Sequence, residues 1–127
     1  MPFDWAEFMG VAKAHIGQAA NPSDEAKDRC AMSRAYYAAF KKTHGYISST
    51  RPSVDLGEAG DAHARLPRWL KDQQNRDLSR IGEHLVRLKR RRKTADYDDT
   101  DMSRSRDLAR DAIRMCNEVL QTLDSEP

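Results

Sequence analysis

The chain has 127 residues and carries 22 Lys and Arg against 20 Asp and Glu, which gives a formal net charge of +2. This length is typical of one domain, so we expect a single domain over residues 1–127. Leu, Ile, Val and Phe account for only 20 of the 127 residues, but the near-zero net charge argues against a disordered chain. Such a domain has a thin core, and we expect it to bury apolar surface against a partner.

The sequence pattern argues against several classes of protein. No apolar run approaches the ~18 residues of a membrane-spanning helix, and the acidic segment 1–10 is unlike a signal peptide. The two cysteines, Cys30 and Cys116, have no spacing suited to zinc, and no glycine-rich phosphate-binding motif occurs. We therefore expect a cytoplasmic protein with reduced thiols, no metal and no cofactor.

The amino-acid usage favours helices. Ala and Leu total 25 residues against eight for Val and Ile, and β-branched residues are the ones that strands prefer. We therefore expect an all-α fold, an antiparallel bundle of four to five helices.

The first two predicted helices cover the N-terminal part of the chain. Apolar residues at steps of three and four predict a helix over residues 4–20, and Asn21-Pro22 ends it and starts the next. The second helix is predicted over residues 22–46. The expected core stripe of this second helix comprises Ala26, Cys30, Ser33, Tyr37 and Phe40. Tyr36 is then expected to point toward a second surface, because successive helical residues are about 100° apart.

A loop is predicted over residues 48–60, followed by a short helix over residues 61–72. Leu66, Trp69 and Leu70 are expected to face inward, and Pro67 to lie in the first turn or at a kink. The next helix shows the clearest pattern, since Leu78, Ile81, Leu85 and Leu88 form an apolar stripe that continues into Arg92. It is expected to end near residues 93–94. A final helix is predicted to begin within residues 100–103 and to run to about residue 123. Its expected apolar stripe comprises Leu108, Ala112, Met115 or Cys116, Val119 and Leu123.

Two charged blocks lie between the last two predicted helices. Residues 87–93, RLKRRRK, contain six cations in seven positions, and residues 96–101, DYDDTD, contain four acids in six. One interpretation is a basic helix end followed by an acidic helix start, which the helix dipoles favour. The other is a nucleic-acid-binding surface, because clustered Lys and Arg bind phosphates. The cationic candidates for RNA contact are Arg34, Arg87, Lys89, Arg90, Arg91 and Lys93.

Two motifs carry a resemblance to a known family. The segment 33–40, SRAYYAAF, and the ending Arg92-x-x-Ala95-Asp96-Tyr97 after the Leu85–Leu88 helix resemble HEPN domains (higher eukaryotes and prokaryotes nucleotide-binding). The likeness is to the small stand-alone bacterial and archaeal members, and it extends over most of the chain, residues 5–123. It implies a four- to five-helix bundle that commonly dimerises.

The resemblance also implies functions. Enzymatic members of the family are metal-independent ribonucleases whose active site forms across the dimer interface, from an Arg followed after four to six residues by a His. Many are toxins of toxin–antitoxin pairs or components of phage defence. Some are paired with a nucleotidyltransferase that modifies a Tyr near the motif, and others have no known catalysis.

This sequence departs from the catalytic motif of the family. No Arg precedes a His at the required spacing, and Tyr97 stands where the His is expected after Arg92. A neutral Tyr is a poor general base near pH 7, because its ordinary pKa is about 10. The catalytic candidates are therefore Arg92, Asp96 and Tyr97. Arg92 would stabilise the charge of the phosphate, Asp96 would act as a base, and Tyr97 would be a substrate contact or a modification site.

Each candidate also has a structural interpretation. Arg92 is expected to pair with Asp96 or with a carboxylate of the final helix, and Tyr97 to lie in the core or an interface. Tyr36 and Tyr37 are expected to pack, and His63 to be a solvated or capping residue near the start of its helix. We keep Tyr36, Tyr37 and His63 as further site candidates. Cys30 and Cys116 are interpreted as small core residues.

Three hypotheses follow from these features. The first is a HEPN-type, RNA-associated homodimer, a toxin or defence component with a ribonuclease-like groove at the dimer interface. The second is a non-catalytic interaction module or antitoxin-like partner of a nucleotidyltransferase. The third is a helical protein without an RNA role.

Overall fold

A computed structural model of the chain describes residues 22–97 and 104–126. These residues form four helices, α2 (Pro22–Thr50), α3 (Ala59–Lys71), α4 (Arg76–Tyr97) and α5 (Ser105–Ser125). No strand occurs within the described ranges, so the predicted all-α helical bundle is confirmed. The helix predicted over residues 4–20 and the helix start predicted within residues 100–103 lie outside the described residues.

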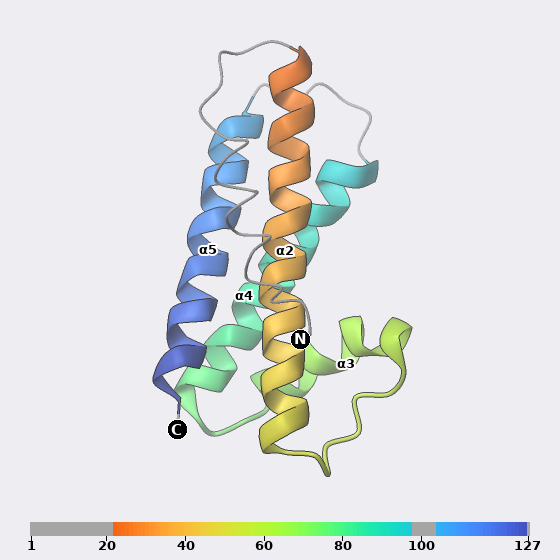
Figure 1. The fold of residues 1–127 in the computed structure, drawn as a ribbon, viewed down its shortest axis with the longest axis vertical. Coiled ribbons are helices and arrows are strands. Elements are labelled where there is room, and N and C mark those ends of the chain that lie inside the picture. Colours follow the sequence, from red (N-terminus) through yellow and green to blue (C-terminus); the bar gives the residue numbers. More distant parts are fainter. Residues whose placement is uncertain (1–21, 98–103, 127) are drawn as a thin grey trace, which may run out of the picture.

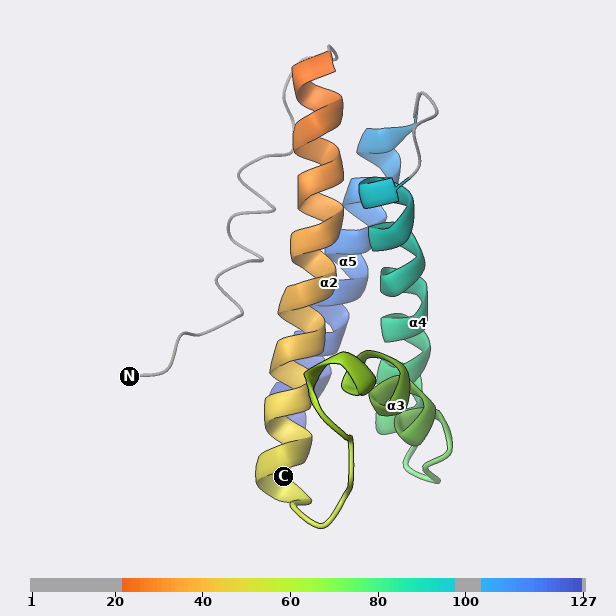
Figure 2. The ribbon, with the colours of Figure 1, turned by 90° about the vertical axis from the view of Figure 1, so that its right-hand side faces the viewer.

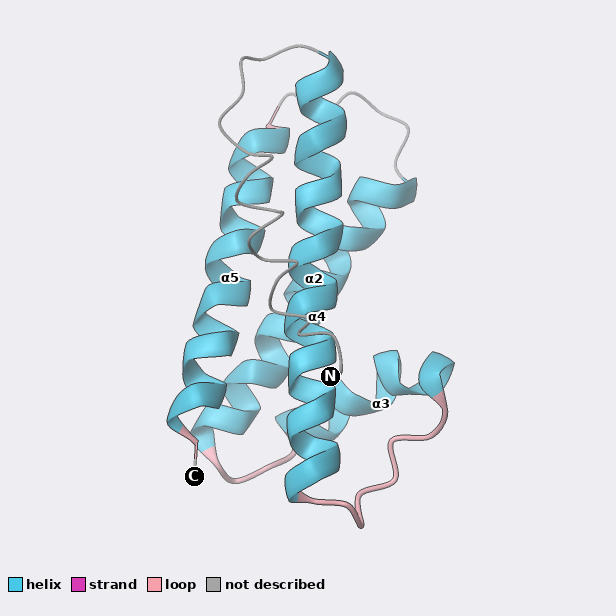
Figure 3. Cartoon of the chain, in the orientation of Figure 1, coloured by secondary structure: helices cyan, strands magenta, loops and turns pink. Residues whose placement is uncertain are grey.

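Three long helices form the body of the bundle. α2 and α5 run in the same direction, and α4 runs antiparallel to both (Figure 1). α2 packs most extensively against α5 and then against α4, whereas α3 packs mainly on α4. The short α3 lies across the lower part of α4, on the side of the bundle away from α5 (Figure 2). Figure 3 shows that loops connect α2 to α3 and α3 to α4 at the same end of the molecule.

The predicted apolar stripes of α3, α4 and α5 form most of the core. Leu78, Ile81, Leu85 and Leu88 are at most 1% exposed, as their spacing predicts. Leu66 and Leu70 of α3 are fully buried, and Trp69 packs against the core from the edge. The buried residues of α5 include Ala112, Met115, Cys116, Val119 and Leu123.

The predicted core face of α2 is wrong. Ala26 and Cys30 are exposed and Tyr37 is half-buried, whereas Tyr36 is fully buried. Of the predicted stripe only Phe40 belongs to the core. The true core face is built largely on small residues, Ala31, Ala35, Ala38 and Ala39, with Met32 and Tyr36. Alanines let α4 and α5 approach α2 closely, but they occur on both faces of a helix, so the stripe predicted through Tyr37 and Phe40 falls on the wrong side.

Two helices run further than predicted because tertiary contacts hold their last turns. α2 continues to Thr50 because Ile47 is fully buried, and Pro52 follows the end of the helix. α4 continues to Tyr97 because Arg29 of α2 donates from Nη1 to the carbonyl oxygens of Thr94 (3.2 Å) and Ala95 (3.0 Å). These carbonyls lack partners within the helix, and a cation from a neighbouring helix satisfies them.

Pro67 lies inside α3 rather than in its first turn. Because proline has no backbone N–H, the carbonyl of His63, four residues earlier, loses its helical partner. Lys89 of α4 supplies the replacement, donating from Nζ to that carbonyl oxygen at 3.3 Å. The proline therefore leaves a carbonyl of α3 free to accept a hydrogen bond from the basic block of α4.

The last turn of α3 packs very closely against α4 at Gly82. A Cβ at Gly82 would lie 2.9 Å from the Cβ of Leu70 and 3.0 Å from the backbone nitrogen of Lys71. Glycine is therefore required for this approach, which brings α3 and its His63 against α4.

Candidate nucleic-acid site around Arg92

The basic block of α4 does not form one continuous face. Lys89 and Arg92 are directed toward α3 and α2, since Lys89 contacts the His63 carbonyl and Arg92 lies over two α2 rings. Arg91 points toward α5, where its Nη2 lies 3.6 Å from an Asp111 oxygen. The remaining cations of the block, Arg87, Arg90 and Lys93, are exposed. The six charges that are adjacent in sequence therefore divide among three directions.

The structure assembles a group of polar and aromatic side chains around Arg92. This Arg92 cluster comprises Arg92, Asp96, Ser33, Tyr36, Tyr37, Phe40 and His63. The guanidinium carbon of Arg92 lies 5.4 Å from the ring centroid of Tyr36 and 5.7 Å from that of Tyr37, both within cation–π range. Its Nη1 also pairs with Asp96 Oδ2 at 3.4 Å, and only 15% of the Arg92 side chain is exposed. Of the two alternative partners expected for Arg92, the structure therefore shows Asp96. The guanidinium is fixed by aromatic rings as well as by this carboxylate.

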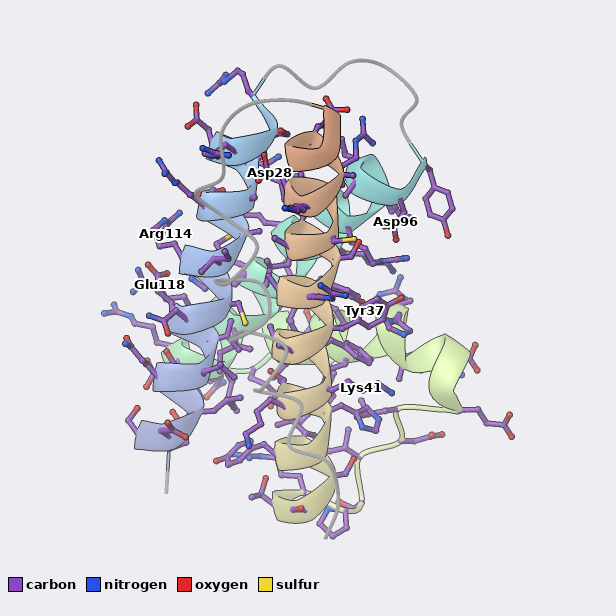
Figure 4. The ribbon with its side chains drawn as sticks, turned by 45° about the horizontal axis from the view of Figure 1, so that its top comes forward. Asp28, Tyr37, Lys41, Asp96, Arg114 and Glu118 are labelled. Carbon is purple, nitrogen blue, oxygen red and sulfur yellow. The ribbon has the colours of Figure 1, made fainter. Side chains whose placement is uncertain are left out.

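Ser33 connects the two motifs that the sequence separates by 63 residues. The Ser33 hydroxyl donates to Asp96 Oδ1 at 2.6 Å, while the other oxygen of Asp96 accepts from Arg92. Sequence reasoning missed this role, because Ser33 opens the aromatic segment but no local pattern relates it to Asp96. Tyr37 and Asp96 project from α2 and α4 toward the same side of the bundle (Figure 4).

His63 belongs to the same cluster and is not a capping residue. Its Nδ1 shares a hydrogen bond of 2.5 Å with the hydroxyl of the fully buried Tyr36. Its ring stacks on Phe40 with centroids 4.0 Å apart and an interplanar angle of 12°. The Tyr37 ring meets it edge-on at 6.1 Å. Stacking and hydrogen bonding together fix the orientation of the imidazole, and Phe40 is a second site residue that the sequence analysis missed.

The surroundings keep His63 and Tyr36 uncharged near neutral pH. Burial lowers the pKa of His63, and the positive charges of Arg92 and Lys89 lower it further. Burial also raises the pKa of Tyr36 well above its ordinary value, so its hydroxyl keeps its proton. Arg92 is charged near neutral pH because the ordinary pKa of arginine lies far above 7. Burial lowers that pKa, but the interactions of Arg92 with Tyr37 and Tyr97 raise it overall.

Two other sequence candidates lie at the margin of this cluster. Tyr97 is 73% exposed, so it does not lie in the core, and its place in an interface stays a prediction. It is the last residue of α4, one turn beyond Lys93, and its side chain hydrogen-bonds Arg92. Arg34 is half-buried on α2, with its Nη1 buried and without a hydrogen-bond partner in the described part of the chain. The structure does not bring Arg34 to Arg92.

A second charged network lies on the other side of the bundle. His84 of α4 is 2.8 Å from Glu118 of α5, and Arg114 bridges Glu118 and Asp111 at 2.9 and 2.6 Å. Arg114 and Glu118 project from α5 away from the side that carries Tyr37 and Asp96 (Figure 4). These pairs join α4 to α5. Among the described residues, the cations that lie over aromatic rings belong to the Arg92 cluster.

Comparisons with known proteins identify no relative. No protein-family model, curated protein or solved structure matches the sequence. Across residues 22–97 and 104–126, no helix has the length and apolarity to cross a membrane. Over the same ranges, no group of three or more His, Cys, Asp or Glu side chains is arranged to hold a metal ion.

We expect the protein to lose stability as the pH falls below about 6.5, the ordinary pKa of histidine. Burial lowers the folded-state pKa of both His63 and His44, and Lys41 acts on both in the same direction. The unfolded chain therefore binds more protons in the window below 6.5, so stability is present above that pH and declines below it.

Urea unfolding at pH 7.5 and pH 5.5 measures this effect. The His63→Gln variant should show a smaller difference in unfolding free energy between the two pH values than the unchanged chain. The Arg87→Gln variant is the control, because Arg87 is exposed and remains charged at both pH values. If the unfolding free energy of all three proteins depends equally on pH, the lowered pKa assigned to His63 is wrong.

Proposed function

We propose that this chain is an RNA-associated domain of the HEPN type, which acts as a homodimer in a toxin or phage-defence system. The position of Arg92 over the rings of Tyr36 and Tyr37, with His63 bound to Tyr36 and Lys89 bound to the His63 carbonyl, supports the proposal most directly. Cations hold backbone phosphates, and the half-buried ring of Tyr37 can stack with an unpaired base, so this combination suits single-stranded RNA. The fully buried Tyr36 acts by holding Arg92 and His63 in place.

The proposed reaction is metal-independent cleavage of the RNA backbone. The ribose 2′-oxygen attacks the adjacent phosphorus, the bond to the 5′-oxygen breaks, and the products are a 2′,3′-cyclic phosphate and a 5′-hydroxyl. His63 takes the proton of the 2′-hydroxyl, and the departing 5′-oxygen receives a proton from water. Arg92 stabilises the negative charge that develops on the phosphate oxygens.

The position of each group fits this division of roles. Asp96, itself held by Ser33, keeps the Arg92 guanidinium in place without burying it completely. In the tautomer that the proposal requires, His63 Nδ1–H donates to the Tyr36 oxygen and Nε2 carries the free lone pair. Because its pKa is lowered, His63 is neutral at pH 7 and able to accept a proton. His63 thereby serves as the general base in place of the histidine that is missing after Arg92.

Incubation of labelled single-stranded RNA with the purified protein in EDTA tests the proposal. The unchanged chain should cleave the RNA and leave 2′,3′-cyclic phosphate ends. His63→Gln should lower the rate by about 10²–10⁴-fold, the usual contribution of a positioned general base. His84→Gln is the matched control, since His84 pairs with Glu118 away from the cluster, and it should cleave normally.

Two results would contradict the catalytic proposal. One is the absence of cleavage across a range of RNA sequences, and the other is equal cleavage by the His63→Gln and unchanged proteins. Light scattering tests the proposed dimer separately, because a monomeric mass at working concentration rules out a groove formed by two copies.

One observation favours the alternative of a non-catalytic module paired with a nucleotidyltransferase. Tyr97 is 73% exposed at the end of α4, so its hydroxyl is accessible to a modifying enzyme. Co-expression with a nucleotidyltransferase from a neighbouring reading frame should then add a nucleotidyl group that mass spectrometry assigns to Tyr97. The Tyr97→Phe variant should remain unmodified, and the half-buried Tyr37 should not substitute for it.

A further inference from the structure

A cavity of about 390 Å³ lies between α3 and α4, next to the Arg92 cluster. His63 forms part of its wall, so the residue that hydrogen-bonds Tyr36 in the aromatic cluster also borders the cavity. Arg68 and Lys71 enter from the last turn of α3 and Lys89 from α4, while Pro67 and Val86 supply apolar wall. Its volume falls at the lower end of the range of small-molecule sites.

The positive charges of this cavity are poorly balanced. Asp72 is the single acid in its lining, against Arg68, Lys71 and Lys89. Within the described residues none of these three cations forms an ion pair with a carboxylate. The neighbouring cations of α4 behave differently, since Arg91 pairs with Asp111 and Arg92 with Asp96. Helix-dipole effects explain cations at the end of α3, but they do not explain why Lys89 of another helix is directed to the same place.

Lys89 is the residue that joins the cavity to the Arg92 cluster. It lies three positions before Arg92, one turn away on α4, and its ammonium group is held at the His63 carbonyl. Burial and repulsion from Lys93 and Arg92 lower its pKa, and the cations around His63 lower the pKa of the imidazole. An anion in the cavity relieves both repulsions, because it brings the opposite charge that the lining lacks.

We infer that this cavity is a second phosphate-binding subsite, which takes the phosphate of a nucleotide flanking the one held at Arg92. The inference rests on the proposed RNA function and deepens it, since it identifies the substrate as a strand that presents two neighbouring phosphates. Lys89, Arg68 and Lys71 hold the phosphate oxygens, and the Pro67 and Val86 walls contact the attached nucleoside. Because the lining contains no paired hydrogen-bonding groups that read one base edge, the subsite is indifferent to base identity.

Calorimetric titration with adenosine 5′-monophosphate tests the subsite, with adenosine as the probe that lacks the phosphate. The unchanged chain should bind the nucleotide and not adenosine. The double variant Arg68→Gln/Lys71→Gln should bind it about tenfold more weakly or worse, because it loses two charge-assisted contacts. The double variant Arg76→Gln/Arg80→Gln removes two exposed cations of α4 outside the cavity and should bind normally.

A second measurement reports on His63 directly. In nuclear magnetic resonance titrations, saturating adenosine 5′-monophosphate should raise the pKa of the His63 ring. Nucleotide binding that is equal in the Arg68→Gln/Lys71→Gln variant, adenosine binding as tight as nucleotide binding, or an unmoved His63 pKa would each overturn the assignment.

Two arms separate this inference from the proposed function. Nucleotide binding should persist in the Arg92→Ala variant, whose RNA cleavage should fall. An unchanged chain that binds the nucleotide but cleaves no RNA contradicts only the proposed function. A short single-stranded RNA should displace the nucleotide from the unchanged chain. A nucleotide that binds but is not displaced by RNA assigns the cavity to free nucleotides and overturns the strand subsite.

Discussion

Replacement of Arg92 by alanine is expected to lower the rate of RNA cleavage by about 10²–10³-fold, the usual cost of removing one preorganised donor for a developing negative charge. The guanidinium is preorganised because two aromatic rings and the Asp96 carboxylate fix it, and 15% of its side chain remains open to a substrate. Single-turnover cleavage of a labelled RNA in EDTA measures the change.

Arg90→Ala is the matched control for this experiment. It removes the same charge from the same helix, but Arg90 is exposed and lies outside the cluster, so its cleavage rate should change little. Arg92→Lys should restore only part of the rate, since an ammonium keeps the charge but lacks the planar fork that stacks on rings. Equal rates for Arg92→Ala and Arg90→Ala, in proteins with unchanged circular dichroism, would rule out the role proposed for Arg92.

RNA binding by Arg92 should also depend on salt. Phosphate contacts release counterions, so affinity for a non-cleaved RNA should fall steeply between low and moderate salt, and Arg92→Ala should reduce the slope. Binding that is absent or insensitive to salt favours the third hypothesis, a helical protein without an RNA role.

Replacement of Leu85 by alanine is expected to lower the free energy of unfolding by about 2–5 kcal/mol, from lost burial and the cavity that remains. Leu85 is fully buried on α4, and α4 is the helix that packs against α2, α3 and α5. A small domain has only about 5–15 kcal/mol of stability, so the loss is a large part of the total. Chemical denaturation followed by circular dichroism measures it.

Arg87→Ala provides the comparison for Leu85→Ala. Arg87 lies two positions further along α4 and is exposed, so its removal should change stability by no more than about 0.5 kcal/mol. A loss for Leu85→Ala as small as that for Arg87→Ala would contradict the core assignment of α4.

The sequence was most informative where large apolar residues repeat at helical spacing. The stripes of α4 and α5 were predicted correctly because Leu, Met and Val have few alternatives to burial. The stripe of α2 was predicted wrongly because its core face consists mainly of alanines, which carry little apolar surface and are common on both faces of a helix. Its long aromatic residues then misled the assignment, since Tyr36 is buried and Tyr37 is only partly so.

The sequence alone determined the helical class and the existence of the described helices, because both depend on spacing within one helix. It left Asp96 and a carboxylate of the final helix as alternative partners of Arg92, and the structure shows the pair with Asp96. The tertiary structure decided which residues surround that pair. Ser33, Tyr36 and His63 lie on α2 and α3, and no local pattern encodes their approach to α4. That approach depends on Gly82, which lets α3 pack against α4, and on Pro67, which frees the carbonyl that Lys89 binds. The near-neutral net charge likewise concealed how the cations of the basic block are divided. Only the packing of α4 against its neighbours separates the paired cations, Arg91 and Arg92, from Lys89, which lines the cavity.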